Sequence, residues 1–319
     1  MFQPKPEFEK RMQELLGEET EEYFKIIHKE LPNWIRCNTL KISPNALINM
    51  LKEKGWKIKQ PFSSNKEIIL VESELKPGEL GNSVEHQKGL FYVQDLASMM
   101  PAIALEPSEK DFVLDLCSAP GSKTTQIAAL MKNSGLLIAN EFDFARAKVL
   151  MENLERCSVS NEIVIRHDAE IICQKLKELK IIPKKILVDA PCSGEGTIRG
   201  SPETLKTWNS NMIKHFSLIQ KRIASAALNL LQPGGELVYS TCTHAPEENE
   251  AVLQHLLENF NIKIEPLKLP MKTRHAVLEW LDDEFEEQII NAARIYPQDN
   301  DSEGFFLAKI IKISDKEKK

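Results

Sequence analysis

Two cysteines that stand fifty positions apart (242 − 192), Cys192 and Cys242, lie in segments whose residue types suit nucleophilic chemistry. The first segment reads "DAPCSGEGTIRG" and the second "YSTCTHAPEENE". Each cysteine follows a hydrophobic, β-branched run and has Pro, Gly, Ser or Thr around it, so each stands where a strand ends and the chain turns. The thiolate form of cysteine is a strong nucleophile. We therefore predict reactive thiols at both positions.

Other cysteines fit a structural interpretation better, because a cysteine is more often a small buried hydrophobic residue than a nucleophile. Cys157 and Cys173 stand on the faces of expected helices, and Cys37 stands in an expected strand. The sequence contains no C-x-x-C pair, which disfavours a zinc ribbon. We expect free thiols and no bound metal.

The two reactive cysteines belong to a regular alternation of strands and helices that begins near residue 111. The runs "FVLDLCS", "LLIANEF", "EIVIRHD", "KKILVDAP" and "GELVYSTC" are strand-like, and helical patterns follow them. Five strands that alternate with helices predict an α/β fold with a parallel, doubly wound sheet covered on both faces. The last apolar run, "GFFLAKIIKI" at 304–313, is expected to add an edge strand, and "NIKIEPLKL" is a candidate to pair with it.

The first part of the chain has a different order of expected helices and strands. Residues 7–30 have the pattern of two short helices broken near Gly17. A strand, a helix capped by Ser43 with Pro44 at its first position, and a further strand follow. The predicted parts are a small α+β domain over 1–87, a larger α/β domain over 88–315, and a charged tail over 316–319.

Acidic residues stand at the carboxyl ends of the expected strands, where ligands bind in doubly wound sheets. Asp115 ends the first strand, and the tight turn at Gly121 and Ser122 is not G-x-G-x-x-G, which disfavours a dinucleotide. Glu141 ends the second, where an acidic residue commonly accepts hydrogen bonds from ribose hydroxyls. Asp168 ends the third, and it can cap the next helix, contact an adenine amino group, or do both.

The composition is that of an ordinary globular chain, with 319 residues, 42% of them hydrophobic and 28% charged. No apolar run reaches the roughly 18 to 20 residues that span a bilayer. The N-terminal "MFQPKPEFEKRMQ" is too charged for a secretory signal. We therefore expect a cytoplasmic protein with no membrane partner. The net charge of −6 argues weakly against a nucleic-acid partner, which usually leaves a basic footprint.

Three segments carry a resemblance to a known family. In this order and spacing, "DLCSAPGSKT", "DAPCSGEGT" and "YSTCTHAPEENE" closely resemble the Nop/Sun family of RNA cytosine-5 methyltransferases. The similarity runs from "RCNTLK" at 36–41, through "YVQDLASMMPAIAL" at 92–105, to "GFFLAKI" at 304–310, and the layout is most similar to the compact archaeal members. The resemblance implies a Rossmann-like class I methyltransferase sheet over 88–315 and S-adenosylmethionine as cofactor.

The resemblance also implies a role for each reactive residue. Cys242 matches the family's nucleophile, which attacks carbon 6 of cytosine, and Cys192 matches the residue that assists release. Asp189 matches an essential aspartate that contacts the cytosine edge, and Lys123 matches an important lysine. Two thiols suit this chemistry, because carbon 5 of cytosine is a poor nucleophile until a thiolate adds at carbon 6, and the adduct must later be broken.

By the same matching, one pocket is expected to hold S-adenosylmethionine, with Asp115 and the following turn at its methionine part, Glu141 at the ribose and Asp168 at the adenine. The full predicted set is Asp115, Cys117, Ser118, Ala119, Pro120, Gly121, Ser122, Lys123, Glu141, Arg146, Asp168 and Asp189. Two positions depart from the family pattern. Ser122 stands where a second glycine is more usual, and Thr207 stands where a basic residue usually precedes the tryptophan.

The net charge does not exclude RNA, because RNA binding needs a local basic surface rather than a basic total. We expect the loop 193–210, with Trp208, to be flexible and to meet the substrate, whose target base must leave its stack. The candidate basic contacts are Lys184, Lys185, Arg199, Lys206, Lys214, Lys221 and Arg222, with Arg36 and Lys41 in the small domain.

Two rival functions fit parts of this pattern. A DNA cytosine-5 methyltransferase uses the "PC" cysteine as its nucleophile and lacks the "TC" cysteine, so the presence of both favours RNA. A non-catalytic RNA-binding or ribosome-assembly factor would be expected to have lost at least one of Lys123, Asp189, Cys192 and Cys242. Among RNA substrates, the resemblance to compact archaeal members favours tRNA, with ribosomal RNA as the alternative, and we expect a monomer.

Overall fold

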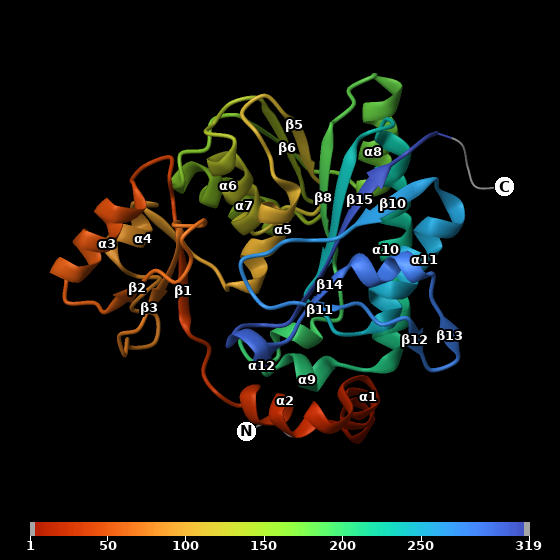
Figure 1. Cartoon of the computed structure of the whole chain (residues 1–319). Helices are drawn as coiled ribbons and strands as arrows, with labels where there is room; N and C mark the ends of the chain where they lie inside the picture. Colours follow the sequence, from red (N-terminus) through yellow and green to blue (C-terminus); the bar gives the residue numbers. More distant parts are fainter. Residues whose placement is uncertain (1–3, 316–319) are drawn as a thin grey trace.

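The computed structural model describes residues 4–315, so the predicted charged tail over 316–319 lies outside the described residues. A central sheet organises the larger part of the chain (Figure 1). Its parallel half has the strand order β7-β6-β5-β8-β9. The bounds are β5 Phe112–Asp115, β6 Leu136–Asn140, β7 Glu162–Ile165, β8 Lys185–Asp189 and β9 Glu236–Thr241. The predicted doubly wound α/β sheet is therefore confirmed.

The other half of the sheet is antiparallel and more extensive than the sequence suggested. β15 (Phe305–Lys312) pairs with β9, and also with β10 (Ile262–Glu265) and β14 (Ala293–Ile295). The pairing of "NIKIEPLKL" with the last strand is confirmed, but the prediction of an edge strand at 304–313 was wrong. β15 lies inside the sheet because β10 and β14, which precede it in the chain, pair along its second side, and β11 (Arg274–His275) pairs with β14 beyond it.

Helices cover both faces of the sheet (Figure 1). One face packs against side chains of α5 (Met100–Leu105), α6 (Ser122–Leu130) and α7 (Phe144–Arg156). The other packs against α8 (Ala169–Glu178), α10 (Ser210–Leu230) and α11 (Glu250–Asn259). Asp143 and Asp168 cap α7 and α8 by accepting hydrogen bonds from backbone N–H groups of the first turn. Among residues 4–315, no helix has the length and apolar character needed to cross a membrane.

A second, four-stranded sheet lies apart from the first, at the left of Figure 1. Its order is β2-β3-β1-β4, with β1 Asn33–Cys37, β2 Ile58–Lys59, β3 Ile68–Val71 and β4 Phe91–Val93. The helices α3 (Pro44–Glu53) and α4 (Val84–Gln87) belong to this part, and Ser43 caps α3 as predicted. Because β4 pairs with β1, the small sheet extends beyond residue 87, to Val93.

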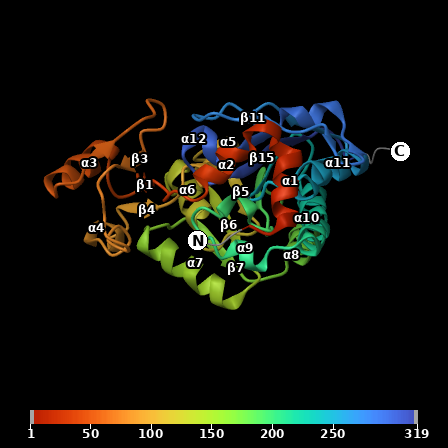
Figure 2. The same cartoon turned by 90° about the horizontal axis from the view of Figure 1, so that it is seen from below.

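The N-terminal helices do not pack on the small sheet, although the sequence grouped them with it. α1 (Pro6–Leu16) and α2 (Thr20–Ile26) are separated by a short 3-10 helix, η1 (Gly17–Glu19), which matches the predicted break. Their apolar side chains pack against the segment after β8, which holds η3 (Glu195–Thr197) and α9 (Thr204–Thr207). Seen from below, α1 and α2 lie across the larger domain rather than beside α3 (Figure 2).

Short elements complete the chain. They are η2 (Ala97–Met99), η4 (Pro246–Glu248), η5 (Glu287–Asn291), α12 (Pro297–Asn300), β12 (Glu279–Trp280) and β13 (Asp283–Glu284). β12 and β13 form a separate two-stranded hairpin.

Candidate active site

The predicted site residues meet at the carboxyl edge of the parallel strands. β5 lies between β6 and β8, so the chain runs to β6 and β7 on one side and to β8 and β9 on the other. This reversal of strand order leaves a crevice outside the strand ends, which is where ligands bind in such folds. Asp115 ends β5 and Asp189 ends β8. The cysteine segments follow β8 and β9.

The two cysteines lie side by side. The Sγ atoms of Cys192 and Cys242 are 3.3 Å apart. The segments that carry them are joined directly, since the hydroxyls of Ser193 and Thr243 are 2.7 Å apart and the N–H of Gly196 donates to the carbonyl of Cys242 at 2.9 Å. A β-carbon at Gly196 would lie only 2.2 Å from the carbonyl oxygen of Gly304, so this close approach requires glycine.

A lysine–aspartate pair stands beside the cysteines. Lys123 Nζ lies 2.7 Å from Asp189 Oδ2 and donates to Ser98 Oγ at 3.2 Å. The other oxygen of Asp189 accepts a hydrogen bond from Ser240 at 2.7 Å, so both carboxylate oxygens have a donor. Burial alone would lower the pKa of Lys123, but the negative charges of Asp189, Cys242 and Asp115 outweigh it and raise that pKa. Lys123 is therefore a permanent cation in the site.

The turn 117–123 follows β5, and next to it one carboxylate oxygen of Asp115 lacks a hydrogen-bond partner. We call this turn, together with Asp115, the cradle. A cis peptide bond joins Ala119 to Pro120, and Gly121 has a φ of 101° that side chains with a β-carbon rarely adopt. Asp115 is buried; its Oδ2 accepts from Thr124 at 2.7 Å and its Oδ1 has no partner. Burial raises the pKa of Asp115 to about 7, with a further contribution from Asp189. A buried acceptor without a donor suits a bound ligand that supplies one.

Glu141 is buried and aligned with the same turn. Its Oε2 accepts from the N–H of Ala119 at 3.3 Å, and its Oε1 accepts from the N–H of Asp143 at 2.9 Å. Arg146 donates to the carbonyl of Ala119 at 2.8 Å, with its second nitrogen 3.8 Å from Glu141. Arg146 therefore contacts the turn 117–123 directly, through Ala119.

Asp168 caps α8 through hydrogen bonds from the N–H groups of Glu170 and Ile171, the structural role that the sequence left open. It also lines a cavity of about 520 Å³ whose other lining residues are Phe142, Asp143, Phe144, Arg166, His167 and Ile171. This cavity adjoins the ends of β6 and β7. Aromatic and aliphatic side chains together with two acids, Asp143 and Asp168, suit a flat heterocycle that carries an amino group.

Sequence reasoning missed Asn140, which ties the strand ends together. Its side-chain amide donates to the carbonyls of Leu116 and His167, and its oxygen accepts from the N–H of His167. The signal was present, because an asparagine that ends the apolar run "LLIAN" must find partners for its amide. Asn140 therefore fixes the spacing of the residues that follow β5, β6 and β7.

Several predicted RNA contacts are wrong because the side chains are buried. Arg36 is 2% exposed and bonds inward, and Arg199 donates to carbonyls of Lys29 and Glu30. Trp208 is 0% exposed; its Nε1 donates to Glu195, and Phe8 packs against its ring. Ile198, Leu205 and Trp208 of the loop 193–210 therefore pack against α1 and α2, while positions 200–203, 206, 207 and 209 are exposed.

Lys184 and Lys185 are also misplaced as RNA contacts near the cysteines. They stand at the amino end of β8, while Cys192 follows its carboxyl end, and Lys185 is buried. Of the remaining candidates, the exposed ones are Lys41, Lys206, Lys214 and Arg222, and Lys221 is half-buried.

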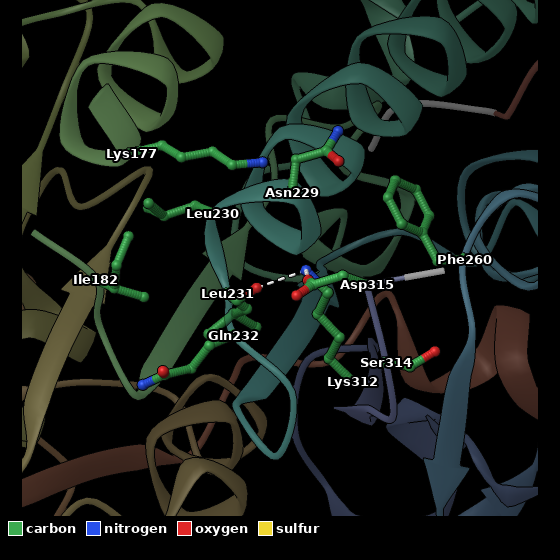
Figure 3. A pocket seen from close by; sticks show the side chains of 10 residues that line it. All are labelled: Lys177, Ile182, Asn229, Leu230, Leu231, Gln232, Phe260, Lys312, Ser314 and Asp315. Carbon is green, nitrogen blue, oxygen red and sulfur yellow. Dashed lines mark hydrogen bonds and ion pairs between the residues drawn. The ribbon is translucent and has the colours of Figure 1, made fainter. Parts of the chain in front are cut away.

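A different pocket, of about 320 Å³, lies at the opposite end of the sheet (Figure 3). Lys312 points its Nζ to the carbonyl of Leu231 there, at 2.5 Å. Its ten lining residues include none of the predicted site residues. The candidate site is therefore the carboxyl edge of the sheet with the cysteine pair. Within the described part of the chain, no cluster of three or more His, Cys, Asp or Glu residues could hold a metal ion.

The strand order, the acids at the strand ends and the cysteine pair define a Rossmann-like methyltransferase fold with an N-terminal domain. Residues 102–311 match the family model described as 16S rRNA methyltransferase RsmB/F. Residues 5–96 match the N-terminal domain of 16S rRNA methyltransferase RsmF. The chain belongs to the RsmB/F methyltransferase family, which confirms the resemblance found in the sequence.

Relatives and solved structures agree with this assignment. The chain is 41% identical to Ribosomal RNA small subunit methyltransferase F of Vibrio campbellii and of Shewanella piezotolerans, over 92% of its own length in each case. It spans only 60% of the length of these relatives. A methyltransferase homolog protein from Pyrococcus horikoshii is 37% identical, with a TM-score of 0.85 over 97% of this chain and 95% of that one. NSun6 from the same organism, solved with SFG, is 26% identical, with a TM-score of 0.84 over 98% of this chain and 99% of that one.

Proposed function

We propose that this chain transfers a methyl group from S-adenosylmethionine to carbon 5 of a cytosine in RNA, through a covalent bond between Cys242 and carbon 6 of the base. The observation that carries the proposal is the cysteine pair, 3.3 Å apart, beside the Lys123–Asp189 ion pair at the carboxyl edge of the sheet. Family membership supports the reaction type.

Cys242 is the nucleophile in this proposal. Its thiolate adds to carbon 6, and the electron pair moves through the ring to make carbon 5 nucleophilic. The Lys123 ammonium, whose pKa is raised in part by the charge on Cys242, lies close enough to stabilise the thiolate. Asp189 presents its carboxylate to the cytosine edge, steadied by donors from Ser240 and Lys123.

Cys192 acts in the second half of the reaction. After carbon 5 has received the methyl group, its proton must leave, and the bond between Cys242 and carbon 6 must break so that the aromatic ring returns. A base must take that proton, and Cys192, which is adjacent to Cys242, lies close enough to assist the step. Loss of Cys192 should then leave the covalent adduct in place.

The residues of the cradle fit S-adenosylmethionine, which would supply an electrophilic methyl group on its sulfonium. Asp115 Oδ1 is buried without a hydrogen-bond partner, just before the turn 117–123, and suits the methionine part. Glu141 suits the ribose hydroxyls, with Arg146 bracing the same turn. Asp168, with the cavity at the ends of β6 and β7, suits the adenine.

We propose small-subunit ribosomal RNA as the substrate, in the cytoplasm, in place of the tRNA that the sequence favoured. The relatives at 41% identity are named ribosomal RNA small subunit methyltransferase F, and both family models refer to 16S rRNA. The preference for tRNA rested on the compact layout alone. A monomeric state stays a prediction.

Two experiments test the function. Bisulfite sequencing of total RNA, with and without the gene, should show one or more cytosines in small-subunit rRNA that lose methylation. Purified protein with labelled RNA and cofactor should give a slow-migrating protein–RNA band on a denaturing gel for Cys192→Ala and none for Cys242→Ala. A band from Cys242→Ala alone would reverse the two cysteine roles. Loss of methylation only in tRNA would overturn the substrate.

A further inference from the structure

A fully buried carboxyl group, Glu248, lies behind the cysteine pair, and none of the roles above uses it. Its Oε2 accepts hydrogen bonds from the N–H of Ser193 at 3.0 Å and from the side-chain amide of Gln220 at 2.7 Å. Its Oε1 is buried without a partner. Glu248 and Gln220 are both 0% exposed. An acid is rarely buried in this way without a cation, so its position calls for an explanation.

Glu248 and Gln220 together hold the backbone on both sides of Cys192. Gln220, from α10, donates to the carbonyl of Pro191 at 2.8 Å as well as to Glu248. Glu248, from η4, accepts from Ser193. Pro191 and Ser193 are the chain neighbours of Cys192, so the direction of its side chain depends on this pair of contacts.

The charges around the two sulfurs are arranged asymmetrically. Lys123 interacts electrostatically with Cys242, and Glu248 with Cys192. The hydrogen bond to Cys242, burial, and the charges of Cys242 and Glu248 all raise the pKa of Cys192 well above its usual value. Burial raises the pKa of Glu248 to about 8, with a contribution from Glu195. A cation thus stands by one sulfur and an acid by the other.

We propose that Glu248, braced by Gln220, is a positioning residue that holds Cys192 beside Cys242 and keeps Cys192 in the thiol form, so that the thiolate of the pair forms on Cys242. This inference rests on the proposed function for its consequence in catalysis, though not for its electrostatics. The asymmetry explains why two cysteines 3.3 Å apart do not exchange the roles of nucleophile and release residue. The negative charge forms on Cys242, which attacks the base. Cys192 keeps its proton until the later release step.

The electrostatic part is tested by alkylation, independently of methyl transfer. In a Cys242→Ser background, the rate at which iodoacetamide modifies Cys192 is measured by peptide mass spectrometry from pH 7 to 10, with and without Glu248→Gln. The neighbouring titratable groups are unchanged in these variants: Glu195 acts on Glu248, Tyr239 interacts with both Glu248 and Cys192, and the Lys123–Asp189 pair stays beside position 242. Above the Glu248 pKa of about 8, Glu248→Gln removes a negative charge and so favours the Cys192 thiolate, and the profile should move about 1 to 2 pH units lower in that range. An unmoved profile overturns this part.

The matched control is Glu247→Gln in the same background. Glu247 precedes Glu248 in the chain, but its carboxylate pairs with Arg11, at 2.7 Å, rather than facing Cys192. The alkylation profile of Cys192 should not move in this variant. An equal shift in both variants would show a general effect of the segment and would overturn the assignment to Glu248.

The positioning part is tested with the two cysteines intact. Gln220→Ala removes the hydrogen bonds to Pro191 and to Glu248 without changing a charge. Glu248→Gln retains an oxygen that can accept from Ser193. In single-turnover reactions with rRNA, Gln220→Ala should slow release and leave more covalent adduct, as Cys192→Ala does, while methyl transfer persists. Adduct levels equal to wild type in a folded Gln220→Ala overturn the positioning role. If even Cys192→Ala gives no adduct, the proposed function fails, while the alkylation result stands separately.

Discussion

Replacement of Arg36 by methionine should destabilise the protein far more than the loss of a surface charge. The Arg36 guanidinium is buried and joins the small sheet to the larger domain. It donates to Gln94 Oε1 at 2.6 Å, to the carbonyl of Ser122 at 2.6 Å, and to Thr125 Oγ1 at 2.8 Å. Burial lowers its pKa to about 10, so it remains a cation at neutral pH.

The magnitude follows from those three contacts. A hydrogen bond to a charged group contributes about 1.5 to 3 kcal/mol, and acceptors left buried without a donor add to the cost. Removal of the guanidinium also relieves its own desolvation, which offsets part of the loss. We therefore expect Arg36→Met to lower the free energy of unfolding by about 3 to 5 kcal/mol. Arg36→Lys should recover only part, because an ammonium cannot reproduce the forked geometry.

The assay is urea unfolding followed by circular dichroism, with calorimetry of S-adenosylmethionine binding as a second measurement. Cofactor affinity should fall as well, because Arg36 holds the first turn of α6, which carries Lys123. The control is Lys41→Met, whose exposed side chain reaches the carbonyls of Lys88 and Arg156 and whose loss should cost less than about 1 kcal/mol. If Arg36→Met costs no more than Lys41→Met, this account of Arg36 is refuted.

Three further predictions concern the site. Glu141→Ala should weaken S-adenosylmethionine binding by about 1.5 to 3 kcal/mol in calorimetry, while the exposed Glu152→Ala on α7 leaves it unchanged. Gly196→Ala should lower kcat/KM by at least about tenfold, because the new β-carbon would collide with the backbone of Gly304. The control Gly81→Ala, which has open space around it, should keep the wild-type value. Equal activities of the two variants would contradict the predicted collision. Burial raises the pKa values of Asp115, Glu248 and Glu303 to about 7, 8 and 8, so the folded state binds more protons than the unfolded state. The melting temperature of the free protein should therefore fall from pH 6.5 to 8.5, with a shallower fall in Glu303→Gln.

Local patterns in the sequence were sufficient to predict the α/β fold class. Alternation of β-branched runs with helical patterns predicted the parallel strands, and capping residues such as Ser43 marked helix starts correctly. The predicted parallel strands also placed Asp115, Asp189 and the cysteine segments at one edge of the sheet, because the carboxyl ends of parallel strands lie on the same side. These inferences succeed because they depend on the period of hydrophobicity and on residues a few positions apart.

Tertiary structure alone decided which polar and aromatic side chains are buried. Arg36 looked like a surface cation, yet its partner Ser122 is 86 positions away, and Trp208 looked like a substrate contact until Phe8 and Glu195 enclosed it. β15 became an interior strand only because β10 and β14 pair beside it. The sequence by itself determined the class of fold and the sheet edge at which Asp115, Asp189 and the cysteine segments meet. The packing of distant segments determined which groups face solvent and which sit behind the cysteines, because burial depends on partners that no local pattern contains.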